Sequence, residues 1–73
     1  MTNIIYKEVR AGAHTAWQEK AEEFAGNGVS FVVRPFSKDL HWPFLNDLRE
    51  RFQLAVRFNA LERAAYFDSA GAG

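Results

Sequence analysis

Two histidines and one group of carboxylates are the side chains in this sequence that could do acid–base or metal chemistry. His14 and His41 are the only imidazoles, and a catalytic or metal-binding role would need a nucleophile or further ligands beside them. The sequence around each histidine contains no such set. We therefore expect both to be surface or packing residues, and we predict no catalytic residue.

The carboxylates Glu19, Glu22 and Glu23 resemble an acidic cluster, but helical spacing spreads them over the polar side of an amphipathic segment. The glycine pair in Gly26-Asn27-Gly28 resembles a phosphate cradle. Such cradles precede a helix whose N-terminal amides bind the anion, whereas this one follows a predicted helix. We interpret the first pattern as a solvated face and the second as a helix stop.

The cysteine and serine content of the chain gives no indication of a nucleophile or a metal site. The sequence has no cysteine, so it can form no disulfide, thiolate nucleophile or thiolate zinc site. No serine lies in the Gly-x-Ser-x-Gly context of a nucleophile elbow; the serines considered are Ser30, Ser37 and Ser69. We expect no cofactor, no metal and no enzymatic activity.

The composition predicts one small globular domain. A chain of 73 residues buries only about 60% of its unfolded surface and supports one core, which we place at residues 1–68 with a flexible tail at 69–73. Nine basic and nine acidic residues give no net field to recruit nucleic acid or an anionic membrane. The early charges at Lys7 and Glu8 argue against a signal peptide, and we expect a cytoplasmic protein.

The first half of the chain reads as strand, helix and strand. Residues 3–10 are rich in β-formers, and Thr15 with Gln18 forms a capping-box pattern at the start of a helix. Trp17, Ala21 and Phe24 then follow a helical period, and the stop at 26–28 ends the helix. Residues 29–34 alternate as a second strand up to Pro35.

The second half reads as helix and strand, followed by an ambiguous segment. An apolar stripe predicts a helix within residues 37–52, with Asp39 as a candidate N-cap and Pro43 in the first turn. Residues 53–58 alternate as a third strand. For residues 59–68 we favour a returning strand, which places Phe67 in the core and Tyr66 on the opposite face, over a short helix capped by Asn59.

These elements predict an α/β (α+β) fold in the order βαβαββ. Right-handed crossovers place two helices on one face of a small mixed sheet, giving a compact two-layer sandwich. The face turned away from the helices is then open to water or to a partner. We expect the helices to cover four apolar strand residues: Phe31, Val33, Val56 and Phe58.

The element order, with Pro43 early in the second helix and a closing hairpin, resembles the SirA-like bacterial sulfur carriers and the C-terminal domain of the third translation initiation factor. The resemblance covers most of the chain and implies the βαβαββ topology. The carriers work through a Cys-Pro pair at the start of the first helix. His14-Thr15 stands at the comparable place here, so no persulfide can form and sulfur transfer is not implied.

Two surfaces are candidates for binding. The open sheet face would carry Val32, Arg34, Arg57 and Tyr66. Arginine forks pair with carboxylates or phosphates and tyrosine adds rigid contact area, although these arginines can equally pair with nearby strand carboxylates.

The second surface is the loop between the second strand and the second helix. Its candidate residues are Phe36, Lys38, His41 and Trp42. Loops with exposed rings often recognise a partner, and the same rings can instead fold back to close a small core.

We therefore expect a small non-enzymatic binding or regulatory protein that acts on a larger protein partner. Compact domains of this kind are common among phage and mobile-element products that inhibit host machinery. RNA or single-stranded DNA binding through the open sheet face is the alternative. A homodimer is a further expectation, because cores this small supply only about 3–5 kcal/mol without disulfides, metal or oligomerisation. We expect no membrane association.

Overall fold

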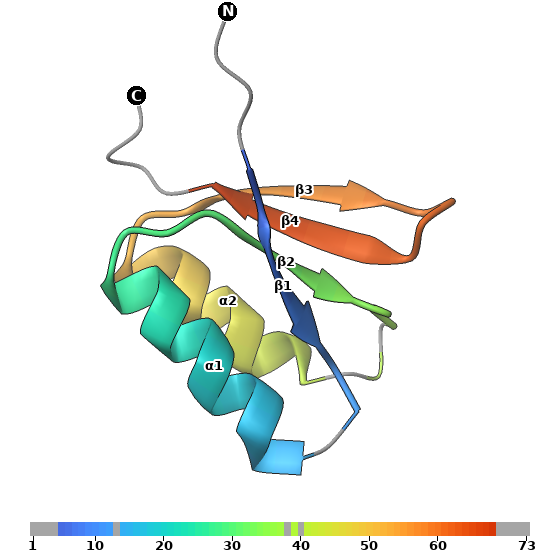
Figure 1. Cartoon of the computed structure of the whole chain (residues 1–73), viewed down its shortest axis with the longest axis horizontal. Helices are drawn as coiled ribbons and strands as arrows, with labels where there is room; N and C mark the ends of the chain where they lie inside the picture. The colour runs from blue at the N-terminus through green and yellow to red at the C-terminus, as the bar shows by residue number, and fades with distance from the viewer. Residues whose placement is uncertain (1–4, 13, 38, 40, 69–73) are drawn as a thin grey trace, which may run out of the picture.

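The computed structural model describes residues 5–12, 14–37, 39 and 41–68. Within them the chain forms four strands and two helices in the order βαβαββ (Figure 1). The elements are β1 (Lys7–Arg10), α1 (His14–Gly26), β2 (Phe31–Arg34), α2 (Trp42–Arg51), β3 (Ala55–Asn59) and β4 (Ala64–Asp68). The predicted element order is confirmed, and the segment 59–68 returns as a strand. The tail at 69–73, with Ser69, and the start of the first predicted strand lie outside the described residues, as does Lys38.

The four strands form one mixed sheet in the order β1-β2-β4-β3. β1 and β2 are parallel, whereas β4 runs antiparallel to both of its neighbours, β2 and β3. Both helices lie on the same side of the sheet (Figure 1). The predicted two-layer arrangement with one open sheet face is therefore confirmed. No helix in the described part of the chain is long and apolar enough to cross a membrane.

Helix α1 forms where the apolar period predicted it, with a different start. Trp17, Ala21 and Ala25 are buried against the sheet. The helix begins at His14, so Thr15 lies inside its first turn and cannot be the N-cap that the capping-box pattern predicted, because an N-cap residue has a non-helical backbone. The predicted stop is confirmed at Gly28, which has a φ of 72°.

Helix α2 begins later than the sequence indicated. Its N-cap is His41, which has left-handed backbone angles and no side-chain capping bond, so the assignment of Asp39 was wrong. With Asp39 as the cap, Pro43 would occupy the position whose N–H makes the first intrahelical bond, and proline has no N–H. With His41 as the cap, Leu45 donates that bond to the His41 carbonyl at 3.3 Å.

The β3–β4 hairpin is closed by a polar turn. The Asn59 side chain accepts a hydrogen bond from the Glu62 amide at 3.1 Å, which is how an asparagine stabilises a turn. Arg63 takes a φ of 53° at the end of this turn. The pairing of Asn59 with Glu62, which could also have capped a short helix, therefore stabilises the turn of a hairpin.

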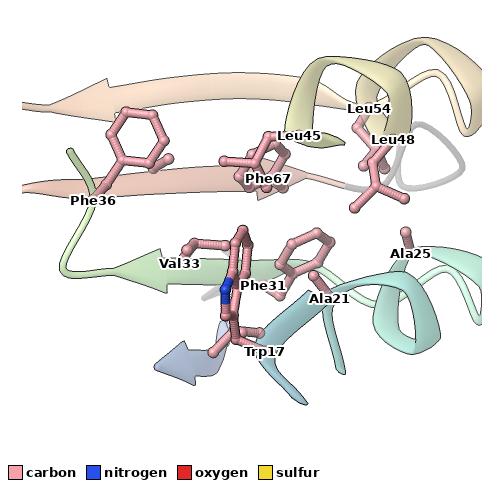
Figure 2. Close-up of a cluster of buried hydrophobic side chains, with 12 residues drawn as sticks. Trp17, Ala21, Ala25, Phe31, Val33, Phe36, Leu45, Leu48, Leu54 and Phe67 are labelled. Atoms are coloured by element: carbon pink, nitrogen blue, oxygen red, sulfur yellow. The ribbon is translucent and has the colours of Figure 1, made fainter. Parts of the chain in front are cut away.

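The core lies between the helices and the sheet (Figure 2). Its largest fully buried side chains are Phe31, Phe67, Leu45, Leu48, Val9 and Val33. Phe36 belongs to the same cluster but lies at the end of it away from Leu48 and Leu54 (Figure 2). This end of the sheet extends past the helices, which matters for the surface described below.

Two strand side chains lie on the predicted faces of the sheet but differ from the prediction in how exposed they are. Phe58 is on the helix side, as predicted, but it is 52% exposed, because β3 continues past the part of the sheet that the helices cover. Val32 is on the open face yet only 6% exposed. Its neighbours across the strands are Glu8 and Tyr66, whose side chains lie on the same face of the sheet.

Candidate functional site

The open sheet face brings together the residues predicted for it and pairs them with one another. Arg34 on β2 forms an ion pair with Glu8 on β1 at 2.9 Å, and its Nε donates a second bond to the same carboxylate oxygen. The hydrogen bond to Glu8 raises the pKa of Arg34. The Arg57 guanidinium lies 4.5 Å from the centre of the Tyr66 ring. Cross-strand pairing therefore accounts for much of the polarity of this face.

A second tyrosine extends the same network. Tyr6 packs edge-on against Tyr66, with ring centres 4.8 Å apart, and donates its hydroxyl to Asp68 at 2.8 Å. Tyr66 donates its hydroxyl to Glu62. Burial, followed by the bond to Asp68, raises the pKa of Tyr6, and the bond to Glu62 raises that of Tyr66. The sequence reasoning missed Tyr6, although its place two residues before Glu8 puts both side chains on one face.

The loop before α2 is divided between the core and the surface. Phe36 is buried, and its amide donates to the Arg63 carbonyl at 2.6 Å, which ties the loop to the β3–β4 turn. Trp42 remains 42% exposed. The His41 ring lies edge-on to the buried Trp17 at 6.5 Å between centres. Phe36 therefore closes the core, as one of the two alternatives predicted, whereas Trp42 faces solvent.

An apolar groove lies where this loop meets the hairpin. Its volume is about 390 Å³, and it is lined by Phe36, Trp42, Val56, Phe58 and Ala65; we call it the apolar groove. The Phe36 ring contacts Trp42 and Phe58 edge-on, at 5.8 and 5.2 Å between centres. The buried Phe36 ring thus contacts two half-exposed rings. All five lining side chains are hydrocarbon or indole, so the groove provides contact area rather than acid–base groups.

The sequence reasoning found two of the five residues that line this groove. It selected Phe36 and Trp42, and it assigned Val56 and Phe58 to the surface beneath the helices. No local pattern in the sequence separates these two positions from covered ones, because the groove forms where the loop before α2 meets the hairpin.

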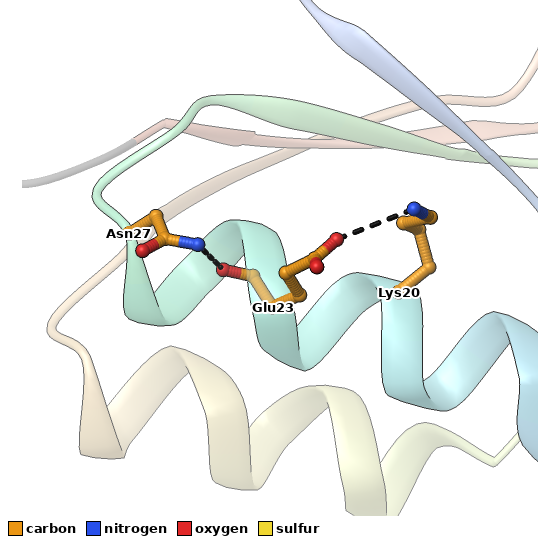
Figure 3. Close-up of polar contacts among 3 residues, drawn as sticks. All are labelled: Lys20, Glu23 and Asn27. Atoms are coloured by element: carbon orange, nitrogen blue, oxygen red, sulfur yellow. Dashed lines mark hydrogen bonds and ion pairs between the residues drawn. The ribbon is translucent and has the colours of Figure 1, made fainter.

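The remaining chemistry-bearing residues form no site within the described ranges. Glu23 on α1 pairs with Lys20 at 3.2 Å, and its carbonyl accepts a bond from the Asn27 side chain at 2.9 Å (Figure 3). Glu22 pairs with Arg51 on α2 at 2.9 Å. Among the described residues, no group of three or more His, Cys, Asp or Glu side chains is arranged to hold a metal ion.

Comparison with known proteins gives a short similarity to part of a much longer protein. A stretch of 36 residues, 49% of this chain, is 47% identical to part of the peroxisome proliferator-activated receptor delta of Canis lupus familiaris. The match spans only 8% of the length of that receptor, so it shows no family membership for this chain. No protein-family model matches the sequence, and no solved structure matches it.

Proposed function

We propose that this chain is a non-catalytic protein-binding domain and that the apolar groove is its binding surface. The observation that carries the proposal is the pair of half-exposed rings, Phe58 and Trp42, that both contact the buried Phe36 edge-on. Tryptophan and other aromatic anchors contribute much of the energy of protein interfaces. Ligand pockets are commonly apolar concavities of roughly 300–1,000 Å³, and this groove is within that range.

The groove is a better candidate than the open sheet face. On that face Arg34 is already paired with Glu8, and a nucleic acid would have to displace this carboxylate to reach the guanidinium. The chain also has no net charge, whereas nucleic-acid affinity depends mainly on neutralising phosphates. Binding of a larger protein, in the manner of an inhibitor or adaptor, agrees better with an apolar concavity.

The test compares what the wild-type domain and two matched variants retain from a lysate of the source cells. Phe58→Ser removes one wall of the groove. Ile5→Ser makes the same kind of polar change at an 80% exposed residue before β1, at the other edge of the sheet. We expect a protein retained by the wild type and by Ile5→Ser to be lost with Phe58→Ser.

Circular dichroism must first show that Phe58→Ser is folded. Retention of the same proteins by all three versions would exclude the groove as the binding surface. If the retained material is instead RNA or single-stranded DNA, and its retention weakens steeply with salt, the open-face alternative replaces this proposal.

A further inference from the structure

The two edges of the sheet differ in how they are protected from further strand pairing. The order β1-β2-β4-β3 leaves β1 and β3 at the edges. Three of the four β1 residues are charged, namely Lys7, Glu8 and Arg10, whereas β3 (Ala55–Asn59) has Arg57 as its single charge. Charged side chains are one of the means by which proteins prevent an edge from pairing with another chain. β3 has no proline or glycine and is the less protected edge.

This less protected edge is also a wall of the apolar groove. Val56 and Phe58 are both β3 residues and both line the groove. A strand added alongside β3 would place every second side chain on the same face as these two residues. Those side chains would enter the groove, while the backbone of the added strand bonded to the free edge. This is the recognition mode called strand addition.

The opposite face of β3 indicates what the other side chains of the added strand should be. Within the described part of the chain Arg57 forms no ion pair with a carboxylate, and its guanidinium lies 4.5 Å from the centre of the Tyr66 ring. The carboxylates nearest to it in the register accept bonds from other groups, since Glu62 accepts from Tyr66 and Asp68 from Tyr6. Opposite charges directly across a strand pair stabilise it. A carboxylate on the added strand beside Arg57 would therefore gain a partner.

A second copy of this chain cannot supply that carboxylate from β3. In a two-fold antiparallel pair, directly opposed residues lie on the same face. In pairings centred on Val56, Arg57 or Phe58, the residue opposite Arg57 would differ. It would be Ala55, the second copy's Arg57 or Asn59, in that order, and none of these is acidic. The other edge, β1, has one acidic residue, Glu8, which is already paired with Arg34, so charge complementarity favours a different protein over a second copy.

We propose that the partner of this domain is an extended segment of another protein that adds as a strand to the β3 edge. Its apolar side chains alternate and fill the groove, and an acidic side chain between them pairs with Arg57. This proposal rests on the groove being the binding surface and specifies the chemistry of what fills it. The two proposals can fail separately, because a helix could occupy the same groove with a different spacing.

The experiment selects binders for the intact domain from a seven-residue random peptide library displayed on phage. Strand addition predicts enriched sequences with apolar residues at every second position and Asp or Glu between them. Enriched sequences with apolar residues three and four positions apart would indicate a bound helix. That result would support the groove as the binding surface and contradict strand addition. A selection that enriches no sequence dependent on Phe58 would overturn both proposals.

The best enriched peptide is then synthesised with a matched version in which Lys replaces its acidic residue. We expect the acidic peptide to bind the wild type roughly 2- to 30-fold more tightly than the Lys peptide, and Arg57→Glu to reverse this preference. Arg10→Glu, on the β1 edge, is the control and should leave the ratio unchanged. An unchanged ratio in Arg57→Glu would overturn the proposed charge pairing.

Methylation of the peptide backbone tests the hydrogen bonds to the edge. A strand added to β3 directs alternate amides toward the sheet, so N-methylation at one set of alternate positions should abolish binding and at the other set should not. Equal effects at both sets would overturn strand addition. Light scattering measures whether the domain is a monomer or a homodimer. If the wild type is a homodimer and Phe58→Ser is a monomer, a second copy covers the β3 edge and the proposal is wrong.

Discussion

Phe31 on β2 and Phe67 on β4 stack at the centre of the core, with ring centres 4.9 Å apart and planes 8° from parallel. The two residues are directly opposed in the antiparallel β2–β4 pair, and both are fully buried. β4 comes last in the chain but lies between β2 and β3. The stacked pair therefore joins the hairpin formed by the last two strands to the part of the sheet formed by the first two.

Truncation of this pair should unfold the domain. Phe67→Ala leaves a cavity in the core, which typically costs about 3–5 kcal/mol, and a core of this size supplies only about 3–5 kcal/mol in total. We expect Phe67→Ala to lack a cooperative urea transition at 25 °C. Phe58→Ala removes the same ring from a half-exposed position and should keep a cooperative transition. A folded Phe67→Ala variant would show that the hairpin is held mainly by other contacts.

The ion pair between Arg34 and Glu8 should contribute little to stability. Its side chains are 46% and 35% exposed, and solvent and salt screen exposed pairs so that they stabilise a protein only slightly. A double-mutant cycle with Arg34→Gln and Glu8→Gln, measured by urea unfolding, should give a small coupling energy that decreases further with added salt. A larger coupling that does not depend on salt would contradict this estimate.

Local signals in the sequence predicted most of the secondary structure. The alternation of residues 29–34 and 53–58 and the helical period of Trp17 and Ala21 are properties of neighbouring residues, and the structure contains the corresponding elements. The glycine at 28 and the turn around Asn59 are equally local. These patterns could be interpreted correctly because each element turns one apolar face toward the same core.

Apart from the two helix N-caps, the errors concern features that depend on distant parts of the chain. The exposure of Phe58 depends on how far the helices extend over the sheet, which its own strand pattern does not encode. The burial of Val32 depends on Glu8 and Tyr66, which are its neighbours only after the strands pair. Three of the five residues that line the apolar groove were missed for this reason, since the groove lies between elements that are distant in the sequence.

The two tyrosines of the open face should make stability decrease in strongly alkaline solution. The pKa of each is raised in the folded state, above the unperturbed value of about 10. Between the unfolded and the folded pKa the native state binds more protons, so stability decreases as pH rises through this window. The stabilisation is fully present below about pH 10.

Urea unfolding of the wild type, Tyr6→Phe and Tyr66→Phe at pH 8 and at pH 10.5 measures this effect. Each substitution removes one titrating hydroxyl, so each variant should lose less stability between the two pH values than the wild type does. The comparison cancels the titration of lysines, which all three proteins share. An identical loss in all three would show that neither hydroxyl is linked to folding.

The end of helix α2 can be improved by a single glycine. Gln53 follows the C-cap residue Phe52 and has a φ of 54°, in the left-handed region that glycine adopts without strain. The Leu54 amide donates to the Arg49 carbonyl at 2.8 Å, so the chain turns sharply here.

Left-handed geometry costs a non-glycine residue roughly 1–2 kcal/mol, and the greater flexibility of unfolded glycine offsets part of the gain. We expect Gln53→Gly to stabilise the domain by about 0.5–1 kcal/mol, which corresponds to a rise in melting temperature of roughly 2–8 °C for a domain of this size. Gln53→Ala, which keeps the strain, is the control and should not show this rise. If alanine stabilises the domain as much as glycine does, the gain comes from loss of the glutamine side chain and not from relief of the backbone.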